Sequence, residues 1–256
     1  MIKILLVGCN GRMGTAISHM CKKEDAVEIV AGVDAITDSR FDYPVYTDFS
    51  AIAENVDVII DFSNPKLLPN LLNYSVSHKV PAVLCTTGYS DADIALIENA
   101  SKDIAVFRSG NMSLGINVLI MLAKKAAKVL GESFDVEIIE RHHNQKLDAP
   151  SGTALMLAEA LEETLPYEAE RTYDRHSIRA KRAYNEIGIH SVRGGTIVGE
   201  HDVIFAGENE TVELKHVAQS REVFAAGAVK AAQFLASVNC PGKYNMDDLI
   251  NSCIDI

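Results

Sequence analysis

The residues that most constrain the fold lie at the amino end, where an apolar run ends directly in a glycine-rich turn. Residues 2–7 are continuously apolar, as expected for a parallel strand that is buried on both faces. Three glycines follow within 8–14, then a helical pattern, and then a second apolar run over 27–33 that ends at Asp34. The order of strand, glycine turn, helix, strand and acidic residue is typical of dinucleotide-binding domains. The spacing is Gly-x-x-Gly-x-x-Gly rather than the common Gly-x-Gly-x-x-Gly, so an ordinary strand–helix turn is the alternative.

The alternation of strand and helix continues through the first half of the chain. Apolar runs predict strands over 56–62, 80–85 and 104–107, and helical patterns over 65–77 and 91–100 separate them. This alternation predicts an α/β fold with a Rossmann-type, doubly wound parallel sheet. In such sheets ligands bind beyond the carboxyl ends of the strands.

Candidate cofactor-binding residues follow directly after the predicted strands. Asp34 can accept hydrogen bonds from both ribose hydroxyls of NAD and would repel a 2′-phosphate, and Ala35 offers no compensating charge. We therefore expect NADH to be preferred over NADPH, although Arg12 and Arg40 could still reach a 2′-phosphate. Thr86, Thr87 and Ser109–Met112, which follow two later strands, could also form plain turns. The predicted cofactor-binding residues are Gly8, Asn10, Gly11, Arg12, Met13, Asp34, Cys85, Thr86, Thr87, Ser109, Gly110, Asn111 and Met112.

The second half of the chain has a different pattern. A long helical pattern covers 114–130, and a further helix is predicted over 221–237. Glycine-containing connections at 194–195 and 207–210 are typical of hairpins, whereas 167–182 is polar and predicted to be irregular. We therefore expect an α+β arrangement with a mixed sheet. Its predicted strands cover 134–140, 187–193, 196–206 and 211–218.

The densest group of chemically active side chains lies just after the first of these strands. Cationic or protonatable side chains come first, and a helical pattern then begins near Ser151. The free N–H groups at the start of a helix bind anions with help from the helix dipole, so this segment predicts a site for a small carboxylate-bearing molecule. Each residue alone has an ordinary interpretation: His142 as a structural histidine, Ser151 as a helix N-cap, and Lys146 as a solvated lysine. The group consists of Arg141, His142, His143, Lys146, Ser151, Gly152 and Thr153.

Composition narrows the classes of partner. The chain has 256 residues, 48% of them hydrophobic, and a net charge of −11, which suits one large or two small domains and disfavours nucleic acid as a partner. The five cysteines form no Cys-x-x-Cys pair, which favours free thiols in a reducing cytoplasm over disulfides or zinc. No apolar run approaches the length of a membrane span, so no membrane partner is expected.

Two further kinds of chemistry are disfavoured around the same segment. Ser151 as a hydrolytic nucleophile would be expected within a Gly-x-Ser-x-Gly turn, which the sequence lacks. Adjacent His142 and His143 project in different directions and lack the i, i+4 partner of a metal-binding helix. We therefore predict no metal.

The segment 140–154 resembles a family signature. Its pattern, Glu-x-His-His-x-x-Lys-x-Asp-Ala-Pro-Ser-Gly-Thr-Ala, is similar to that of the 4-hydroxy-tetrahydrodipicolinate reductases, also called dihydrodipicolinate reductases. The resemblance spans nearly the whole chain, including Gly-x-x-Gly-Arg-Met-Gly at 8–14 and the segments 189–195 and 198–201, and is weakest over 34–46. It implies NAD(P)H-dependent reduction of 4-hydroxy-tetrahydrodipicolinate to tetrahydrodipicolinate in the diaminopimelate pathway of lysine biosynthesis. The alternative is a regulatory protein that senses a nicotinamide cofactor without turnover.

The resemblance also implies roles for particular residues and segments. His142 and Lys146 become the candidate catalytic acids, while His143, Ser151, Gly152, Thr153 and Arg221 become substrate-binding residues. Residues 1–112 and 220–256 would form the dinucleotide-binding domain, and 113–219 a domain for substrate binding and oligomerisation. The open face of the second sheet would join subunits into a homotetramer.

Overall fold

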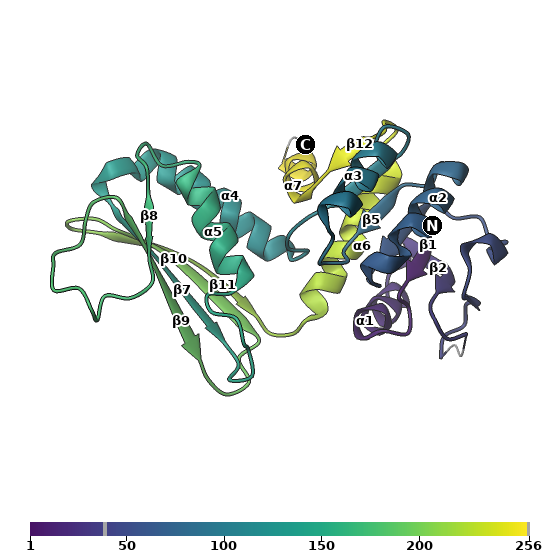
Figure 1. Ribbon diagram of the computed structural model, residues 1–256, viewed down its shortest axis with the longest axis horizontal. Coiled ribbons are helices and arrows are strands. Elements are labelled where there is room, and N and C mark those ends of the chain that lie inside the picture. The colour runs from purple at the N-terminus through teal and green to yellow at the C-terminus, as the bar shows by residue number, and fades with distance from the viewer. Residues whose placement is uncertain (38–39, 255–256) are drawn as a thin grey trace. The chain divides into compact units, whose positions relative to one another are not determined.

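The computed structural model describes residues 1–37 and 40–254, which fall into two compact units (Figure 1). The first unit contains Met1–Ser113 and the segment from Glu222 onward, and the second contains Leu114–Arg221. The chain therefore leaves the first unit once and returns to it once.

The first unit is built on a seven-stranded sheet in the order β12-β6-β5-β4-β1-β2-β3, in which every neighbouring pair is parallel. The predicted doubly wound parallel sheet is thereby confirmed. The continuous apolar runs form the central strands because both of their faces are covered by helices. The strands are β1 Ile2–Val7, β2 Val27–Val33, β3 Val45–Tyr46, β4 Val58–Asp61, β5 Ala82–Leu84, β6 Ala105–Arg108 and β12 Gly242–Tyr244.

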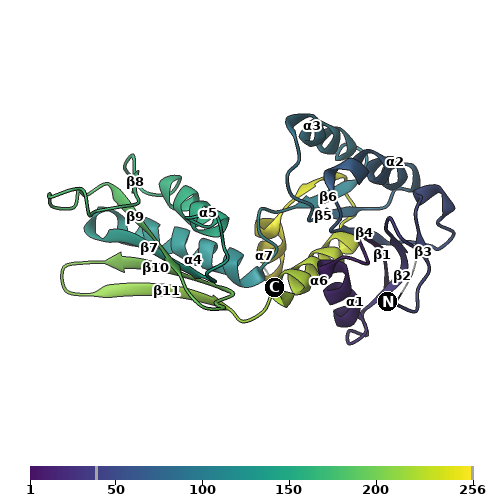
Figure 2. The same ribbon diagram turned by 60° about the horizontal axis from the view of Figure 1, so that its bottom comes forward.

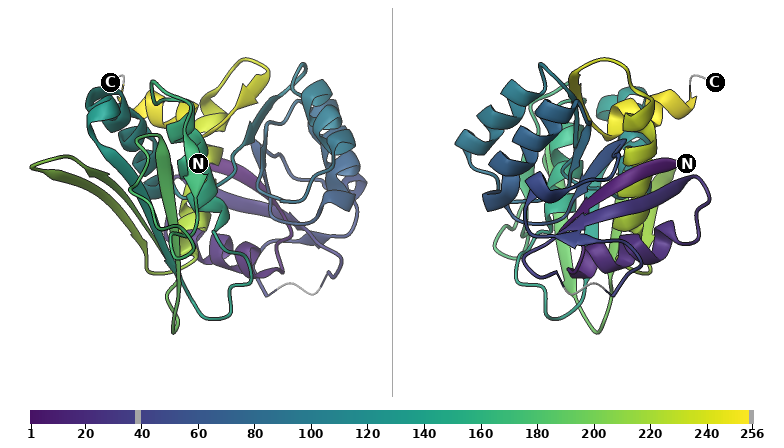
Figure 3. Two further views of the ribbon diagram at one scale, coloured as in Figure 1. Left: turned by 60° about the vertical axis from the view of Figure 1, so that its left-hand side comes forward. Right: turned by 90° about the vertical axis from the view of Figure 1, so that its right-hand side faces the viewer.

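Helices cover both faces of this sheet (Figure 3). α1 and α6 pack on one face, and α2 and α3 lie on the other, where Leu71 and Ile97 meet Leu5 and Ile59 from the strands. The helices are α1 Arg12–Cys21, α2 Leu68–His78, α3 Asp91–Ala100, α6 Glu222–Ser237 and α7 Met246–Ile254.

The structure differs from the sequence prediction in several elements of the first unit. The helix predicted over 65–77 begins with a 3-10 turn, Pro65–Leu67, and becomes α-helical only at Leu68. Pro69 lies in the first turn of α2, where its missing N–H leaves no helical hydrogen bond unmade. The edge strands β3 and β12 and the helix α7 were not predicted. Each of these strands pairs on one side only and is too short to show a pattern.

The second unit carries the predicted mixed sheet, and its five strands lie in the order β11-β10-β7-β9-β8. β10 is antiparallel to both β7 and β11, whereas β9 is parallel to both β7 and β8. α4 and α5 cover one face of the sheet (Figure 2). The elements are α4 Leu114–Leu130, β7 Asp135–His142, α5 Gly152–Glu162, β8 Glu170–Thr172, β9 Glu186–Arg193, β10 Gly199–Ala206 and β11 Thr211–Ala218.

The order of these strands corrects one predicted hairpin. The connection at 207–210 joins neighbouring strands and is a hairpin, closed by the Gly207 N–H donating to the Glu210 carbonyl over 2.8 Å. The connection at 194–195 is not a hairpin, because β7 lies between β9 and β10. Two glycines indicate that the chain reverses, but they do not indicate whether another strand is inserted between the two arms. The segment 167–182 also contains β8, although it was predicted to be irregular.

Alternation along β7 divides the second sheet into an apolar part and a polar part. Val136 and Ile138 face the helices and form the core with residues of α4, α5, β9 and β10. Glu140 and His142 continue the same face at the carboxyl end of the strand, and both are buried. The candidate site in this unit therefore begins where the apolar core ends.

Candidate active site

The predicted cofactor-binding residues all lie at one edge of the parallel sheet. They follow β1, β2, β5 and β6, and the carboxyl ends of parallel strands share an edge. Gly8–Met13 follows β1, Asp34 follows β2, Cys85–Thr87 follows β5, and Ser109–Met112 follows β6. The residues that the sequence assigned to a cofactor are thus brought together within the first unit.

The glycine turn after β1 requires its glycines. Gly8 has φ +79°, and a Cβ atom there would lie 2.5 Å from the carbonyl oxygen of Phe62. A Cβ atom at Gly14 would lie 2.3 Å from the carbonyl oxygen of Gly8, so α1 could not approach the turn as closely. The Gly11 N–H donates to the Gly8 carbonyl over 3.1 Å and closes the turn. The turn is therefore compact enough for a ligand to approach the start of α1.

The start of α1 fits the pyrophosphate of a dinucleotide. Its N-cap is Gly11, which has no side chain to cap the helix, and its first turn, 12–15, carries no acidic residue. The N–H groups of a first turn have no acceptor within their own helix, so they and the helix dipole favour an anion. Arg12, at the first helical position, is exposed and adds a positive charge.

Asp34 organises the neighbouring turn through both of its carboxylate oxygens. Oδ2 accepts the Asn10 N–H over 2.9 Å, and Oδ1 accepts the Ala35 N–H over 2.7 Å. The Asn10 side chain donates to the Ile36 carbonyl over 2.9 Å. The acidic side chain that follows β2 is therefore fixed beside the glycine turn, where a ribose would lie in a dinucleotide-binding fold.

A buried carboxylate after β4, which sequence reasoning missed, organises the next two turns. Asp61 accepts hydrogen bonds from the Ser63 hydroxyl over 2.5 Å and from the Tyr89 hydroxyl over 3.2 Å. The Ser63 N–H also donates to Thr86 Oγ1 over 3.0 Å, which ties the loop after β4 to the loop after β5. Burial raises the pKa of Asp61. The signal in the sequence was an acidic residue at the end of an otherwise apolar strand.

In the second unit, strand register brings distant polar residues into rows on the helix-facing side of the sheet. His201 on β10 lies opposite His216 on β11 and opposite Glu140 on β7. Two residues further along β7, His142 lies opposite Arg193 on β9. A Cβ atom at Gly199 would lie 3.1 Å from His142 Nε2, so the glycine leaves room for the ring. Of these residues, the sequence reasoning assigned a role only to His142.

Glu140 is the centre of this group and is completely buried. Its Oε2 lies 2.6 Å from His142 Nδ1 and accepts Arg193 Nη1 over 2.8 Å. Its Oε1 accepts Arg193 Nη2 over 2.7 Å and the Ser151 N–H over 3.1 Å. Burial alone would raise the pKa of Glu140, but the hydrogen bonds from Arg193 and His142 outweigh it and lower the pKa to about 2. Glu140 is therefore ionised throughout the neutral range.

Ser151 is the N-cap of α5, and it is almost fully buried. Its hydroxyl accepts the Ala154 N–H over 3.2 Å and lies 3.0 Å from His201 Nε2. Its own N–H already donates to Glu140, which corrects the expectation that this N–H is available to an anion. Gly152, the first residue of the helix, is exposed, and Thr153 is half-buried. A ligand at this helix start would therefore meet Gly152 and Thr153.

The predicted cationic cluster separates onto two faces because β7 continues through His142. Arg141 points to the face opposite the helices, where it pairs with Asp202 and lies 3.5 Å from Glu200. It therefore does not contribute to the anion site. Lys146 lies in the loop before α5, and its ammonium group is 2.9 Å from Asp148.

The two imidazoles near Glu140 have different surroundings. The rings of His142 and His201 meet edge to face, with their centroids 5.2 Å apart. Burial lowers the pKa of His201 to about 4, with a further contribution from the nearby His142. His201 is therefore uncharged at neutral pH, and burial also lowers the pKa of His216. Arg221 is exposed and follows β11, whose carboxyl end lies at the same end of the sheet as His142.

Both units of the chain are similar to proteins of one known family. Residues 2–112 match the family model described as dihydrodipicolinate reductase, N-terminus, and residues 115–250 match the corresponding C-terminus model. A 4-hydroxy-tetrahydrodipicolinate reductase of Caldanaerobacter subterraneus subsp. tengcongensis is 54% identical over 250 residues, covering 98% of each chain. One from Clostridium tetani is 52% identical over 252 residues, again covering 98% of each.

The chain belongs to the 4-hydroxy-tetrahydrodipicolinate reductase family. It is an NAD(P)H-dependent oxidoreductase of lysine biosynthesis, and the prediction made from 140–154 is confirmed over the cofactor-sensing alternative. A solved structure, a dipicolinate-bound dihydrodipicolinate reductase from Paenisporosarcina sp. TG-14, is 25% identical with a TM-score of 0.78. The match covers 96% of this chain and 97% of that chain.

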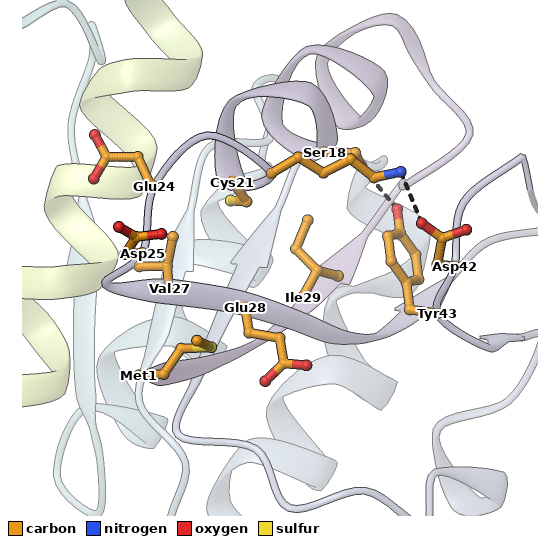
Figure 4. A pocket seen from close by; sticks show the side chains of 11 residues that line it. Met1, Ser18, Cys21, Glu24, Asp25, Val27, Glu28, Ile29, Asp42 and Tyr43 are labelled. Carbon is orange, nitrogen blue, oxygen red and sulfur yellow. Dashed lines mark hydrogen bonds and ion pairs between the residues drawn. The ribbon is translucent and has the colours of Figure 1, made fainter.

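One cavity of the first unit lies away from the candidate cofactor-binding residues. It has a volume of about 340 Å³ and is lined in part by Met1, Val27 and Tyr43, whose hydroxyl is bonded to Ser18 over 2.8 Å (Figure 4). Val27 is the first residue of β2, so the cavity lies at the amino ends of the strands, opposite the edge where ligands bind in such sheets. A second cavity, of about 410 Å³, includes Ser109 and Gly110 and therefore reaches the cofactor edge.

The thiols of the chain agree with the sequence prediction. All five cysteines are free, and Cys9 and Cys21 are buried, which raises the pKa of each to about 11. Within residues 1–37 and 40–254, no cluster of three or more His, Cys, Asp or Glu side chains could hold a metal ion. No helix in the same ranges is long and apolar enough to cross a membrane.

Proposed function

We propose that the reduction of 4-hydroxy-tetrahydrodipicolinate by this chain depends on two groups of residues, one in each unit. The loops after β1, β2, β5 and β6 bind the nicotinamide dinucleotide, which supplies the hydride. The end of β7 and the start of α5 bind the substrate and supply the proton. The observation that carries this assignment is the position of His142. This protonatable side chain lies at the carboxyl end of β7, on the face of the sheet that the helices cover, beside the start of α5, where Gly152 is exposed.

The chemistry of the substrate explains why acids are needed. The family substrate is a cyclic imine with two carboxylates; it loses water, and the resulting conjugated C=C–C=N system accepts the hydride. Negative charge then develops toward the ring nitrogen, so an acid that donates a proton there lowers the barrier. Such an acid contributes about 10²- to 10⁴-fold in rate. His142 and Lys146 are the two candidates.

The two candidate acids are held in different ways. His142 lies on a strand with its Nδ1 against a buried carboxylate, so its Nε2 is the atom left to meet a ligand. Lys146 lies on a loop and pairs with Asp148, so it can also exchange that partner for a substrate carboxylate or polarise the imine. His143, half-buried beside them, completes the substrate contacts.

The start of α5 binds a substrate carboxylate. Gly152 and Thr153 present the N–H groups and hydroxyl of a helix start, where the helix dipole favours a negative charge. Ser151 holds this helix start in place as its N-cap and through the contact with His201. Arg221 is an additional cation at the same end of the sheet.

We further propose that NADH is the preferred cofactor. Asp34 is fixed beside the glycine turn, where its carboxylate can accept from the ribose hydroxyls but repels a 2′-phosphate. The exposed side chains of Arg12 and Arg40 account for residual use of NADPH. The predicted preference is measured as the ratio of kcat/KM with NADH to that with NADPH, and equal values would contradict it.

The face of the second sheet opposite the helices is proposed to join subunits into a homotetramer. It carries Ile139 and Ile204 at its centre and the exposed side chains of Val192 and Val217, surrounded by ion pairs such as Arg141–Asp202. Apolar residues surrounded by charged pairs are typical of a protein–protein interface. Light scattering coupled to gel filtration tests this, and a monomeric mass would contradict it.

The residue assignment is tested by single substitutions assayed with the aldol product of pyruvate and aspartate semialdehyde. His142→Ala and Lys146→Ala should each lower kcat by about 10²-fold or more, because each removes a candidate proton donor. The Kd for NADH should stay unchanged, since neither side chain belongs to the first unit. Lys128→Ala, on the exposed surface of α4, serves as a control with unchanged kcat. Turnover at the wild-type rate in both site variants would contradict the assignment.

A further inference from the structure

Glu140 divides its two oxygens between two parts of the proposed substrate site. Oε2 meets His142 Nδ1 at 2.6 Å, and Oε1 accepts the Ser151 N–H at the start of α5 over 3.1 Å. Each oxygen also accepts one nitrogen of the Arg193 guanidinium, over 2.8 and 2.7 Å. The planar fork of arginine holds a carboxylate in one orientation, so neither oxygen can rotate away from its second partner.

We propose that Glu140, clamped by Arg193, is a positioning residue that sets the ring orientation and tautomer of His142 and at the same time fixes the start of α5. This inference rests on the proposed roles of His142 and of the α5 start. The carboxylate itself is fully buried, so it acts through the two elements that it holds.

Glu140 determines which nitrogen of the neutral His142 ring carries the hydrogen. An ionised carboxylate only accepts hydrogen bonds, so His142 Nδ1 must carry the hydrogen whenever the ring is neutral. Nε2 is then the atom that gains and loses a proton, and it is the atom beside Gly199.

The other groups around His142 do not replace Glu140 as the partner of its Nδ1. Arg193 on β9 is positive, but each of its terminal nitrogens donates a hydrogen bond to the Glu140 carboxylate. His201 on β10 is uncharged at neutral pH, because burial lowers its pKa to about 4. His216 on β11 lies behind His201, and burial lowers its pKa as well. α5 contributes only the neutral Ser151.

Glu140 also holds the start of α5 through the Ser151 N–H. The first N–H groups of a helix lack partners within the helix, and Glu140 satisfies that of the N-cap residue itself. This bond fixes how Ser151 enters the helix and therefore where Gly152 and Thr153 present their N–H groups. One carboxylate thus keeps the proton donor and the anion-binding turn in a constant relation.

Glu140→Gln tests the two positioning roles of Glu140 in a side chain of nearly unchanged shape. A glutamine amide keeps the shape of the side chain but has one acceptor oxygen. It therefore cannot accept hydrogen bonds from both His142 Nδ1 and the Ser151 N–H. We expect kcat to fall at least about tenfold and the kcat–pH profile to differ from that of the wild type. KM for the substrate should rise as well, whereas the Kd for NADH should not change.

The matched control is Glu162→Gln. Glu162, near the end of α5, also accepts two nitrogens of an arginine, Arg171, over 2.5 and 2.6 Å. The control therefore removes the charge of another arginine-clamped glutamate from the same unit, away from His142. Its pH profile and KM should equal those of the wild type.

A direct measurement on the wild-type chain does not depend on any variant. The ¹⁵N shifts of the neutral His142 ring should be those of the Nδ1–H tautomer. An Nε2–H tautomer would overturn the inference, as would an unchanged pH profile and KM in Glu140→Gln. If His142→Ala instead retained full turnover while the Nδ1–H tautomer was observed, the proposed role of His142 would fail and the tautomer assignment would stand.

Discussion

His142 Nδ1 lies 2.6 Å from a carboxylate oxygen of Glu140, two residues earlier on the same strand. Residues i and i+2 share one face of a strand, so β7 itself brings the two side chains together. Arg193 and Ser151 also donate hydrogen bonds to this carboxylate. An ionised glutamate can remain buried here because every oxygen is hydrogen-bonded and a cation lies beside it.

The pH dependence of stability should report this carboxylate. The pKa of Glu140 is about 2 in the folded chain, because the hydrogen bonds from Arg193 and His142 outweigh the effect of burial. Since the unfolded value is about 4.3, the stabilisation is complete above that pH and is lost as pH falls toward the folded value. At neutral pH, Glu140→Gln should lower the free energy of unfolding by about 1.5–3 kcal/mol. Urea titrations between pH 7 and pH 2 should show the difference shrinking with acidity; a constant difference would contradict it.

Ser151→Ala should cost about 1 kcal/mol of stability, because it removes the N-cap of α5. Ser90→Ala is the matched control, since Ser90 caps α3 in the first unit through the Asp93 N–H. Both variants should lower the thermal midpoint by similar amounts. Only Ser151→Ala should also raise KM for the substrate, and an unchanged KM would indicate that Ser151 serves the fold alone.

Asp34→Asn should shift the cofactor preference toward NADPH. The change removes a negative charge beside the expected ribose position, and about 1.4 kcal/mol of relieved repulsion corresponds to a tenfold change in the ratio of kcat/KM values. Asp57→Asn is the control. Asp57 also accepts a backbone N–H, that of Lys3, but it lies at the amino ends of the strands. Parallel changes in both variants would show that the effect is not specific to Asp34.

Gly8→Ala and Gly88→Ala separate backbone strain from close contact. The two glycines have nearly equal φ values, +79° and +81°. A Cβ atom at Gly88 meets nothing within 4 Å, so alanine there should cost only the left-handed backbone, about 1–2 kcal/mol. Gly8→Ala should cost more and weaken NADH binding, because its Cβ meets the Phe62 carbonyl at 2.5 Å. Thermal unfolding and fluorescence titration measure both effects, and equal losses would contradict the close contact.

Most of the first unit could be predicted from the sequence because its central strands are buried on both faces. β1 and β2 have the predicted bounds, since an uninterrupted apolar run can be satisfied only inside a covered parallel sheet. β3 and β12 could not be predicted, because an edge strand of two or three residues depends on the neighbour it pairs with. The glycine turn indicated the cofactor edge, but Asp61 does not belong to that motif.

The candidate site of the second unit could be located from the sequence but not assembled. The motif around His142 gave its position, whereas Glu140 and Arg193 are 53 residues apart and meet only through the parallel pairing of β7 and β9. Arg141 seemed equivalent to its neighbours in sequence, yet strand alternation turns it to the other face. Ser151 was correctly expected to begin a helix. That its N–H already has an acceptor depends on Glu140, which only the fold brings near.

We propose that a substrate held at the start of α5 receives its proton from His142 or Lys146. The most direct measurement is the oxidation of NADH, followed by its absorbance, with freshly condensed pyruvate and aspartate semialdehyde as substrate. We predict substrate-dependent oxidation by the wild type, and about a hundredfold lower kcat in His142→Ala and in Lys146→Ala with an unchanged Kd for NADH. Wild-type rates in both variants, or no oxidation by the wild type, would contradict the account.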